Sequence, residues 1–210
     1  MIEPRPSSGS LMFLDIETLG FVGRPVFLIG CLFEQPQAEI VQFLARDYAE
    51  EASALEAFRA ELGRRPSPVW VTFNGASFDL PALRLRFIAN RLEAPSVPGH
   101  LDLLHTARRL WGPSLPDCRL RTLEARLLGR HRIADLPGER IPAAYHAFVR
   151  TGEPWEMLGI LKHNVADLLA LRDLTRLAAE MRPQDGTLRS ALREAEGAPA
   201  GVAGGLRDEG

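Results

Sequence analysis

Apolar and polar positions in the first third of the chain follow the pattern of short strands. Apolar or alternating runs cover residues 11–15, 25–33 and 39–44. A period of two is typical of strands, because successive side chains point to opposite faces. The gaps between these runs are too short for a crossover connection, so we expect an antiparallel meander. The next two segments are predicted to be a helix ending before Gly63 and a fourth strand, at residues 50–62 and 69–73.

Helical spacing dominates the rest of the chain. Further helices are predicted at residues 80–92, 103–110, 120–128, 141–149 and 155–181. The buried stripe of the last helix is predicted to consist of Leu158, Leu161, Val165, Leu168 and Leu169. Three strands, a helix, a fourth strand and then helices that cover a sheet describe a layered α/β domain.

The length of 210 residues suits one well-buried domain. Residues 1–10 are rich in Pro and Ser and are expected to be a flexible N-terminal arm. Residues 182–210 lack apolar periodicity, apart from a possible short helix at 188–196, and are expected to be a flexible tail. The folded domain is therefore expected at residues 11–181.

Composition excludes several classes of protein. No apolar stretch reaches the roughly 20 residues that cross a bilayer, and the N-terminus lacks a secretory signal, so we expect a cytoplasmic protein without a membrane partner. Cys31 and Cys118 form no CxxC pair, which argues against a zinc cluster, and both are interpreted as buried thiols.

The charge is unevenly distributed although the net charge is only −2. Between Arg84 and Arg132 there are 10 Arg and four acids, a local charge of +6. This basic middle segment is typical either of solvated helix faces or of a surface that follows a phosphate backbone.

Three acidic motifs follow the predicted elements. Asp15 and Glu17 lie at the end of the first strand, where alternation directs both carboxylates to one face. Two carboxylates side by side repel each other and are usually tolerated when a cation bridges them, although an exposed strand end also shows this pattern. The second motif, NGASFDLP, joins a strand to a helix. Asp79 in this motif is interpreted as an N-cap that can also be a ligand, and the side-chain amide of Asn74 as a support for the loop.

The third motif is HNVAD on the last predicted helix. Its i, i+4 spacing places His163 and Asp167 on one face, as in many exposed helical ion pairs. Asp102 and His105 lie three residues apart and are interpreted as a pair at a helix end rather than as catalytic groups.

Together the motifs resemble the DEDD exonucleases, which include the proofreading domains of DNA polymerases and ribonuclease D-like enzymes. The sequence is similar above all to the YprB-like branch of the ribonuclease H-like superfamily, through the segments FLDIETLG, FNGASFDLPAL, HLDLLHTARRLW, RLRTLEARLLG, IPAAYHAFVRTG and HNVADLLAL. The resemblance implies a ribonuclease H-like three-layer fold, with a mixed central sheet whose first three strands are antiparallel and which helices flank. One position departs from the pattern, since DEDD enzymes carry Tyr at Y-x3-D or His at H-x4-D and this chain carries His163 at H-x3-D.

The resemblance also implies a two-metal 3′–5′ exonuclease acting on single-stranded DNA or RNA 3′ ends. Two Mg²⁺ or Mn²⁺ ions would be bound by Asp15, Glu17, Asp79 and Asp167, and His163 would orient water or accept its proton. Thr18 and Asn74 would lie near the terminal nucleotide. Two alternatives remain open at this point. One is a non-catalytic nucleic-acid-binding or scaffold module that retains the fold, and the other is a metal-dependent transferase or phosphatase.

Overall fold

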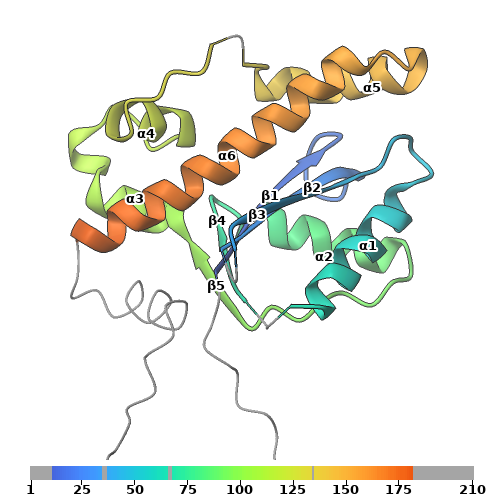
Figure 1. Cartoon of the computed structure of the whole chain (residues 1–210), viewed down its shortest axis with the longest axis horizontal. Coiled ribbons are helices and arrows are strands. Elements are labelled where there is room, and N and C mark those ends of the chain that lie inside the picture. The colour runs from blue at the N-terminus through green and yellow to red at the C-terminus, as the bar shows by residue number, and fades with distance from the viewer. Residues whose placement is uncertain (1–10, 35–36, 66–67, 134, 182–210) are drawn as a thin grey trace, which may run out of the picture.

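The computed structural model describes residues 11–34, 37–65, 68–133 and 135–181. The arm at 1–10 and the tail at 182–210, including the helix expected at 188–196, lie outside the described residues. At the centre of the molecule lies a five-stranded sheet with the order β3-β2-β1-β4-β5 (Figure 1). Its strands are β1 Leu11–Thr18, β2 Val26–Phe33, β3 Glu39–Leu44, β4 Val69–Thr72 and β5 Gly99–Asp102.

Strand β1 marks the point where the sheet changes from antiparallel to parallel pairing. It pairs antiparallel with β2, which pairs antiparallel with β3. On its other side it pairs parallel with β4, and β4 pairs parallel with β5. The expected meander and the expected mixed sheet are therefore confirmed.

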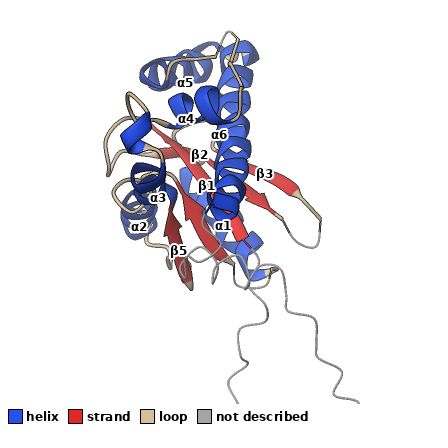
Figure 2. Ribbon diagram, turned by 90° about the vertical axis from the view of Figure 1, so that its left-hand side faces the viewer, coloured by secondary structure: helices blue, strands red, loops and turns tan. Residues whose placement is uncertain are grey.

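Helices cover both faces of the sheet (Figure 2). The helices are α1 Glu51–Gly63, α2 Asp79–Ala89, α3 Leu103–Leu110, α4 Leu120–Leu127, α5 Ile141–Thr151 and α6 Pro154–Met181, with short 3₁₀ turns at Gly112–Ser114 and Gly138–Arg140. One hydrophobic core packs α1 and α2 on one face, and a second packs α3, α4 and α6 on the other. A third cluster joins α5 and the start of α6 to β2. This is the three-layer α/β fold that the sequence predicts.

Some local predictions were wrong. Strand β5 was not expected, because its sequence GHLD is short and contains only one apolar residue. Helix α1 includes Gly63 and is capped by Arg64. Of the two thiols, Cys31 is buried but Cys118 is only partly buried.

The buried stripe of α6 also differs from the predicted one. Leu158 is 40% exposed, and Leu161, Val165 and Leu169 are only partly buried, whereas Leu168 is fully buried as predicted. The observed stripe consists of Met157, Ile160, Asn164, Leu168, Ala170, Leu171, Leu174, Thr175 and Ala178. The helix is thus rotated relative to the expectation, and a polar residue, Asn164, lies at the centre of its buried face.

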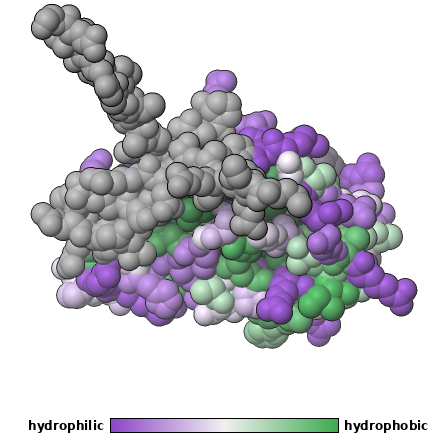
Figure 3. All heavy atoms as spheres, turned by 90° about the horizontal axis from the view of Figure 1, so that it is seen from below, coloured by the Kyte–Doolittle hydropathy of each residue, from purple (hydrophilic) through white to green (hydrophobic). Residues whose placement is uncertain are grey.

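The surface shows no membrane-spanning character in the described residues, because none of their helices is both long and apolar enough to cross a bilayer. Seen from below, hydrophobic surface is divided into patches by polar side chains (Figure 3). A hollow of about 910 Å³ lies beside α2 and the segment before β5, lined in part by Leu85, Ile88 and Val97. It adjoins the α1–α2 core, on the face of the sheet away from α6.

Candidate active site

The first two acids lie on the face of β1 that is covered by α6. Leu11 and Phe13 pack in the core formed with α3, α4 and α6, whereas Met12 packs on the opposite face. Because side chains alternate along a strand, Asp15 and Glu17 continue the row of Leu11 and Phe13. Both remain partly exposed at the carboxyl end of the strand. Because Leu11 and Phe13 fix which face of β1 points into this core, both carboxylates point to the same face, as predicted.

The loop after β4 brings Asp79 to the same end of the sheet. Asp102, the N-cap of α3, accepts hydrogen bonds from the backbone N–H groups of Asn74 at 2.8 Å, Ala76 at 3.1 Å and Leu104 at 3.1 Å. The helix-end position of Asp102 is confirmed, whereas its pairing with His105 stays a prediction, and its carboxylate also fixes the loop. Asp79 is the first residue of α2 rather than its N-cap, which is Phe78. The predicted N-cap was one residue off.

Two residues expected near a substrate contribute mainly through local backbone structure. Asn74 has a φ of 66°, and its carbonyl accepts hydrogen bonds from Ser77 and Phe78, so its main chain rather than its exposed side chain holds the loop. The Thr18 hydroxyl donates to the carbonyl of Gly20 at 2.6 Å and shapes the turn after β1. Their roles toward a nucleotide stay predictions.

The carboxylates influence one another strongly. Burial, followed by the charges of Asp167 and Asp79, raises the pKa of Glu17 to about 8. Burial raises the pKa of Asp79 to about 7, against the effect of hydrogen bonds from its own N–H and that of Ile16. The pKa of Asp15 is raised well above its usual range by burial and then by Asp167 and Glu17. Four acids from β1, α2 and α6 therefore share one electrostatic environment.

This donor set suits hard divalent cations, because it consists of carboxylate oxygens whose negative charges are mutually destabilising without a cation. In the part of the chain that the structure describes, no three His, Cys, Asp or Glu side chains are arranged as a closed ligand set. Asp15 is instead held by Asn164, and Asp167 by Arg132. The four carboxylates fit the predicted metals in the type of donor atom, and their role as ligands remains a proposal.

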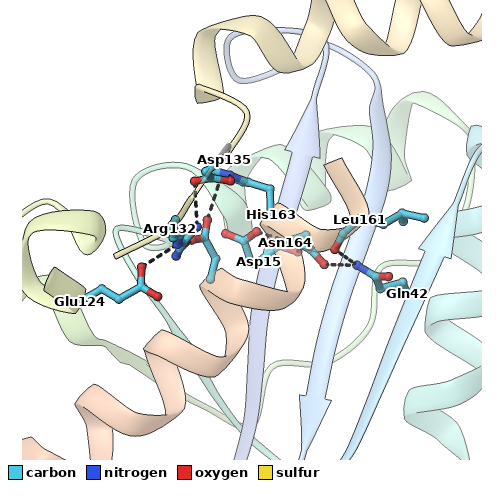
Figure 4. Close-up of polar contacts among 9 residues, drawn as sticks. Asp15, Gln42, Glu124, Arg132, Asp135, Leu161, His163 and Asn164 are labelled. Atoms are coloured by element: carbon cyan, nitrogen blue, oxygen red, sulfur yellow. Dashed lines mark hydrogen bonds and ion pairs between the residues drawn. The ribbon is translucent and has the colours of Figure 1, made fainter. Parts of the chain in front are cut away.

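Asn164 of α6 holds the Asp15 carboxylate and connects α6 to the sheet (Figure 4). Its amide nitrogen donates to the Asp15 carboxylate at 2.8 Å and to the Asp15 carbonyl at 3.1 Å. Its amide oxygen accepts from Gln42 Nε2 at 2.8 Å, and this nitrogen also donates to the Leu161 carbonyl at 3.0 Å. Gly30 of β2 pairs with Asp15 of β1 on one side and with Gln42 of β3 on the other. Since Asn164 bonds to both Asp15 and Gln42, its side chain lies across β2, directly over Gly30.

Arg132 lies in the same close-up and binds acids from three segments (Figure 4). Its guanidinium contacts Glu124 of α4 at 2.6 Å, Asp135 of its own loop at 3.4 Å and Asp167 of α6 at 2.5 Å. Asp135 in turn contacts His163 Nδ1 at 2.8 Å. The loop after α4 is thereby attached to the acidic face of α6.

The last predicted motif has the expected orientation. His163 Nε2 lies 3.4 Å from Asp167 Oδ2, so the prediction that the two residues share one face of the helix is confirmed. The other ring nitrogen binds Asp135. His163 is thus held between an acid of the loop and an acid of its own helix, with 15% of its side chain exposed.

The basic middle segment does not form a single surface. Arg86 lies on α2 and forms an ion pair with the buried Glu51 at 2.6 Å. Exposed Arg108, Arg121 and Arg126 lie on α3 and α4, across the sheet from α2. Within this segment, the arginines of α3, α4 and the following loop therefore lie on the side of the sheet that carries Asp15 and is covered by α6.

Sequence reasoning missed Asn164, Gln42, Gly30, Arg132, Asp135 and Glu124 as residues of this site. Two of them carried a usable signal. A glycine inside an otherwise apolar strand indicates a close approach, which Gly30 fulfils. A polar residue spaced by four from Ile160 and Leu168 indicates a specific contact on a buried helix face, which Asn164 makes. The ion pairs of Arg132 with Glu124 and Asp167 join separate elements and have no local signature.

Glu17 gives a prediction for stability as a function of pH. Since its pKa rises on folding from 4.5 to about 8, the folded state holds a proton that the unfolded chain has released in this range, and stability falls as pH rises. In EDTA we expect the thermal midpoint to decrease between about pH 5 and about pH 8. Glu17→Gln should show a smaller decrease, measured by circular dichroism melts. An unchanged pH dependence in this variant would contradict the assigned environment of Glu17.

Sequence comparison places nearly all of the described residues in one family. Residues 12–179 match the family RNase_H_2, described as the RNase H superfamily. The uncharacterised protein YprB of Bacillus subtilis is 34% identical over 174 residues, which cover 80% of this chain and 41% of that protein. The chain thus spans about two fifths of the length of this relative.

Solved structures with the same fold include two enzymes of nucleic acid metabolism. The family B DNA polymerase of the archaeon Pyrobaculum calidifontis is similar over 93% of this chain and 28% of its own, with a TM-score of 0.62 and 17% identity. Exonuclease I of E. coli, in complex with a dT13 oligonucleotide, is similar over 84% of this chain and 42% of its own, with a TM-score of 0.55 and 17% identity. At this level of identity the likeness establishes the fold.

Proposed function

Because the chain belongs to the RNase H superfamily, we propose that it is a metal-dependent 3′–5′ exonuclease that hydrolyses phosphodiester bonds at single-stranded DNA or RNA ends. The observation that carries this proposal is the convergence of Asp15, Glu17, Asp79 and Asp167 in one electrostatic environment at the carboxyl end of β1. Ligand sites of open α/β sheets occur at this end, where strand order or direction changes. The fold shared with Exonuclease I supports a nucleic acid as the substrate.

In the proposed mechanism Asp15, Glu17, Asp79 and Asp167 would hold two Mg²⁺ or Mn²⁺ ions, which when bound would supply activation of water and stabilisation of negative charge on the phosphate oxygens. The hydrogen bonds from Asn164 keep the Asp15 carboxylate in place. His163, beside Asp167, is positioned to orient the water or to accept its proton. Its contact with Asp135 holds the imidazole ring in place at the unusual H-x3-D spacing.

Digestion of end-labelled DNA and RNA oligonucleotides tests this function. With Mn²⁺ or Mg²⁺, a 5′-labelled single strand should be converted into a ladder of shorter products, and EDTA should prevent this. A phosphorothioate at the last 3′ linkage should block degradation, whereas one at the first 5′ linkage should not. Cleavage that starts inside the strand or at the 5′ end would contradict the proposed polarity, and a lack of cleavage with either metal would contradict a nuclease.

A second candidate is a nucleic-acid-binding module without catalysis. The ion pair between Arg132 and Asp167 favours this candidate, because Arg132 then occupies an oxygen of one of the proposed metal ligands. Such a module would bind oligonucleotides equally well with EDTA and with Mn²⁺ and would not shorten them. The same digestion therefore separates the two candidates.

Phe21 offers a test of how the substrate is bound. It lies four residues after Glu17, in the turn between β1 and β2, and is 88% exposed. Exposed aromatic rings beside a nucleic acid site stack on bases, at roughly 1–3 kcal/mol each. Phe21→Ala should raise KM for a single strand about tenfold or more, measured by initial rates, with little change in the thermal midpoint.

The control for this variant is Ile88→Ala, which removes an exposed apolar side chain from α2, on the other face of the sheet. It should leave KM unchanged. An equal KM for Phe21→Ala and wild type would mean that the turn does not contact the strand.

A further inference from the structure

Arg132 places a buried positive charge against one of the proposed metal ligands. Only 9% of its side chain is exposed, and it lies in the loop between α4 and α5. One terminal nitrogen contacts Asp167 Oδ1 at 2.5 Å. The other Asp167 oxygen faces His163 at 3.4 Å. In this arrangement the charge of Asp167 is balanced by the protein itself.

The remaining contacts of Arg132 hold it at the site independently of Asp167. Its Nε donates at 2.6 Å to Glu124, which is 4% exposed on α4, and Nη1 lies 3.4 Å from Asp135. Two of its three partners, Glu124 and Asp135, are therefore not among the proposed metal ligands. If the contact with Asp167 were lost, Glu124 and Asp135 would still keep the guanidinium next to the acidic face of α6.

We propose that Arg132 competes with a divalent cation for Asp167 and, when the cation binds, turns the released N–H groups to a phosphate of the nucleic acid strand. The first part concerns metal binding alone, and the second rests on the proposed nuclease function. A guanidinium and a divalent cation next to the same carboxylate repel each other, so each weakens the binding of the other. The guanidinium has five N–H donors in a planar fork that matches phosphate oxygens, which makes it suited to the second task.

Binding of Mn²⁺ to the full chain without nucleic acid tests the competition. Arg132→Ala should bind Mn²⁺ about three to ten times more tightly than wild type, measured by electron paramagnetic resonance of free Mn²⁺ or by calorimetry. Arg130→Ala is the matched control, because Arg130 lies two residues away and pairs with Asp173 of α6, which is not a proposed ligand. It should leave the affinity unchanged. Equal or weaker Mn²⁺ binding by Arg132→Ala would overturn the competition and make Arg132 a support for Asp167.

Arg132→Lys retains a positive charge without the planar fork, and it provides a second measurement if the alanine variant fails to fold. It should bind Mn²⁺ within about twofold of wild type, and tighter binding similar to that expected for alanine would overturn the charge competition.

Cleavage of a single-stranded oligonucleotide at saturating Mn²⁺ tests the contact with phosphate. We expect kcat/KM to fall roughly 10²–10³-fold for Arg132→Ala and at least about tenfold for Arg132→Lys, with Arg130→Ala close to wild type. Wild-type cleavage by Arg132→Ala, or by Arg132→Lys, would overturn the phosphate contact. If the wild-type chain cleaves no oligonucleotide, the proposed function fails together with the phosphate contact, while the Mn²⁺ measurement still decides the competition for Asp167.

Discussion

Asp15→Asn is expected to lower the Mn²⁺-dependent cleavage rate about 10³-fold or more while the protein stays folded. Asparagine removes the negative charge that would bind the cations, but its amide oxygen can still accept the hydrogen bond from Asn164. Because burial and neighbouring acids raise the pKa of Asp15, the neutral side chain should not lower stability near neutral pH. The thermal midpoint in EDTA should therefore equal that of wild type or exceed it.

A matched pair of substitutions on α6 shows whether the loss is specific. Asp167 and Asp173 are both partly buried acids of this helix, and both pair with arginines of the loop after α4. Asp167→Asn should lose cleavage as Asp15→Asn does, whereas Asp173→Asn should keep it. Normal cleavage by the Asp15 or the Asp167 variant would exclude the proposed metal site. An equal loss in the Asp173 variant would indicate a general effect of disturbing the helix.

Much of the fold could be predicted because its determinants are local. Strands β1, β2 and β3 are apolar or alternating runs with short connections, and such runs pair with their neighbours in the chain. The pair Asp15 and Glu17 on β1 and the pair His163 and Asp167 on α6 were also predictable as sharing one face, since the strand and helix periods alone determine this.

The features that the sequence did not predict depend on contacts between distant segments. Strand β5 is an edge strand whose main stabilisation comes from pairing with β4, so its own residues carry little strand character. The buried face of α6 includes Asn164, which donates a hydrogen bond to Asp15, a residue 149 positions earlier in the chain. Periodicity identifies an amphipathic helix, but α6 carries two adjacent apolar stripes, and the sequence analysis chose the one that is mostly not buried.

The second large effect is expected from Gly30→Ala, because Gly30 lies directly against the side chain of Asn164. A Cβ atom at position 30 would lie 2.0 Å from Asn164 Oδ1 and 2.6 Å from both Cγ and Nδ2, far closer than atoms can approach. Gly30→Ala must therefore displace the Asn164 side chain, which would break its hydrogen bonds to Asp15 and Gln42. We expect a loss of about 1–3 kcal/mol in unfolding free energy from overpacking, and a strong reduction in cleavage. Gly63→Ala is the control, because a Cβ at the end of α1 meets no atom within 4 Å.

A double-mutant cycle tests whether this steric conflict is the cause. Asn164→Ala removes all three atoms that the new Cβ would meet, so the free-energy losses of Gly30→Ala and Asn164→Ala should not add. The double variant should be about as stable as Asn164→Ala alone in denaturant unfolding, because the added methyl group then occupies vacated space. Its cleavage should stay as low as that of Asn164→Ala, since nothing restores the hydrogen bond to Asp15. Additive losses of stability would show that Gly30 is required for another reason. A recovery of cleavage in the double variant would show that Asn164 does not position Asp15.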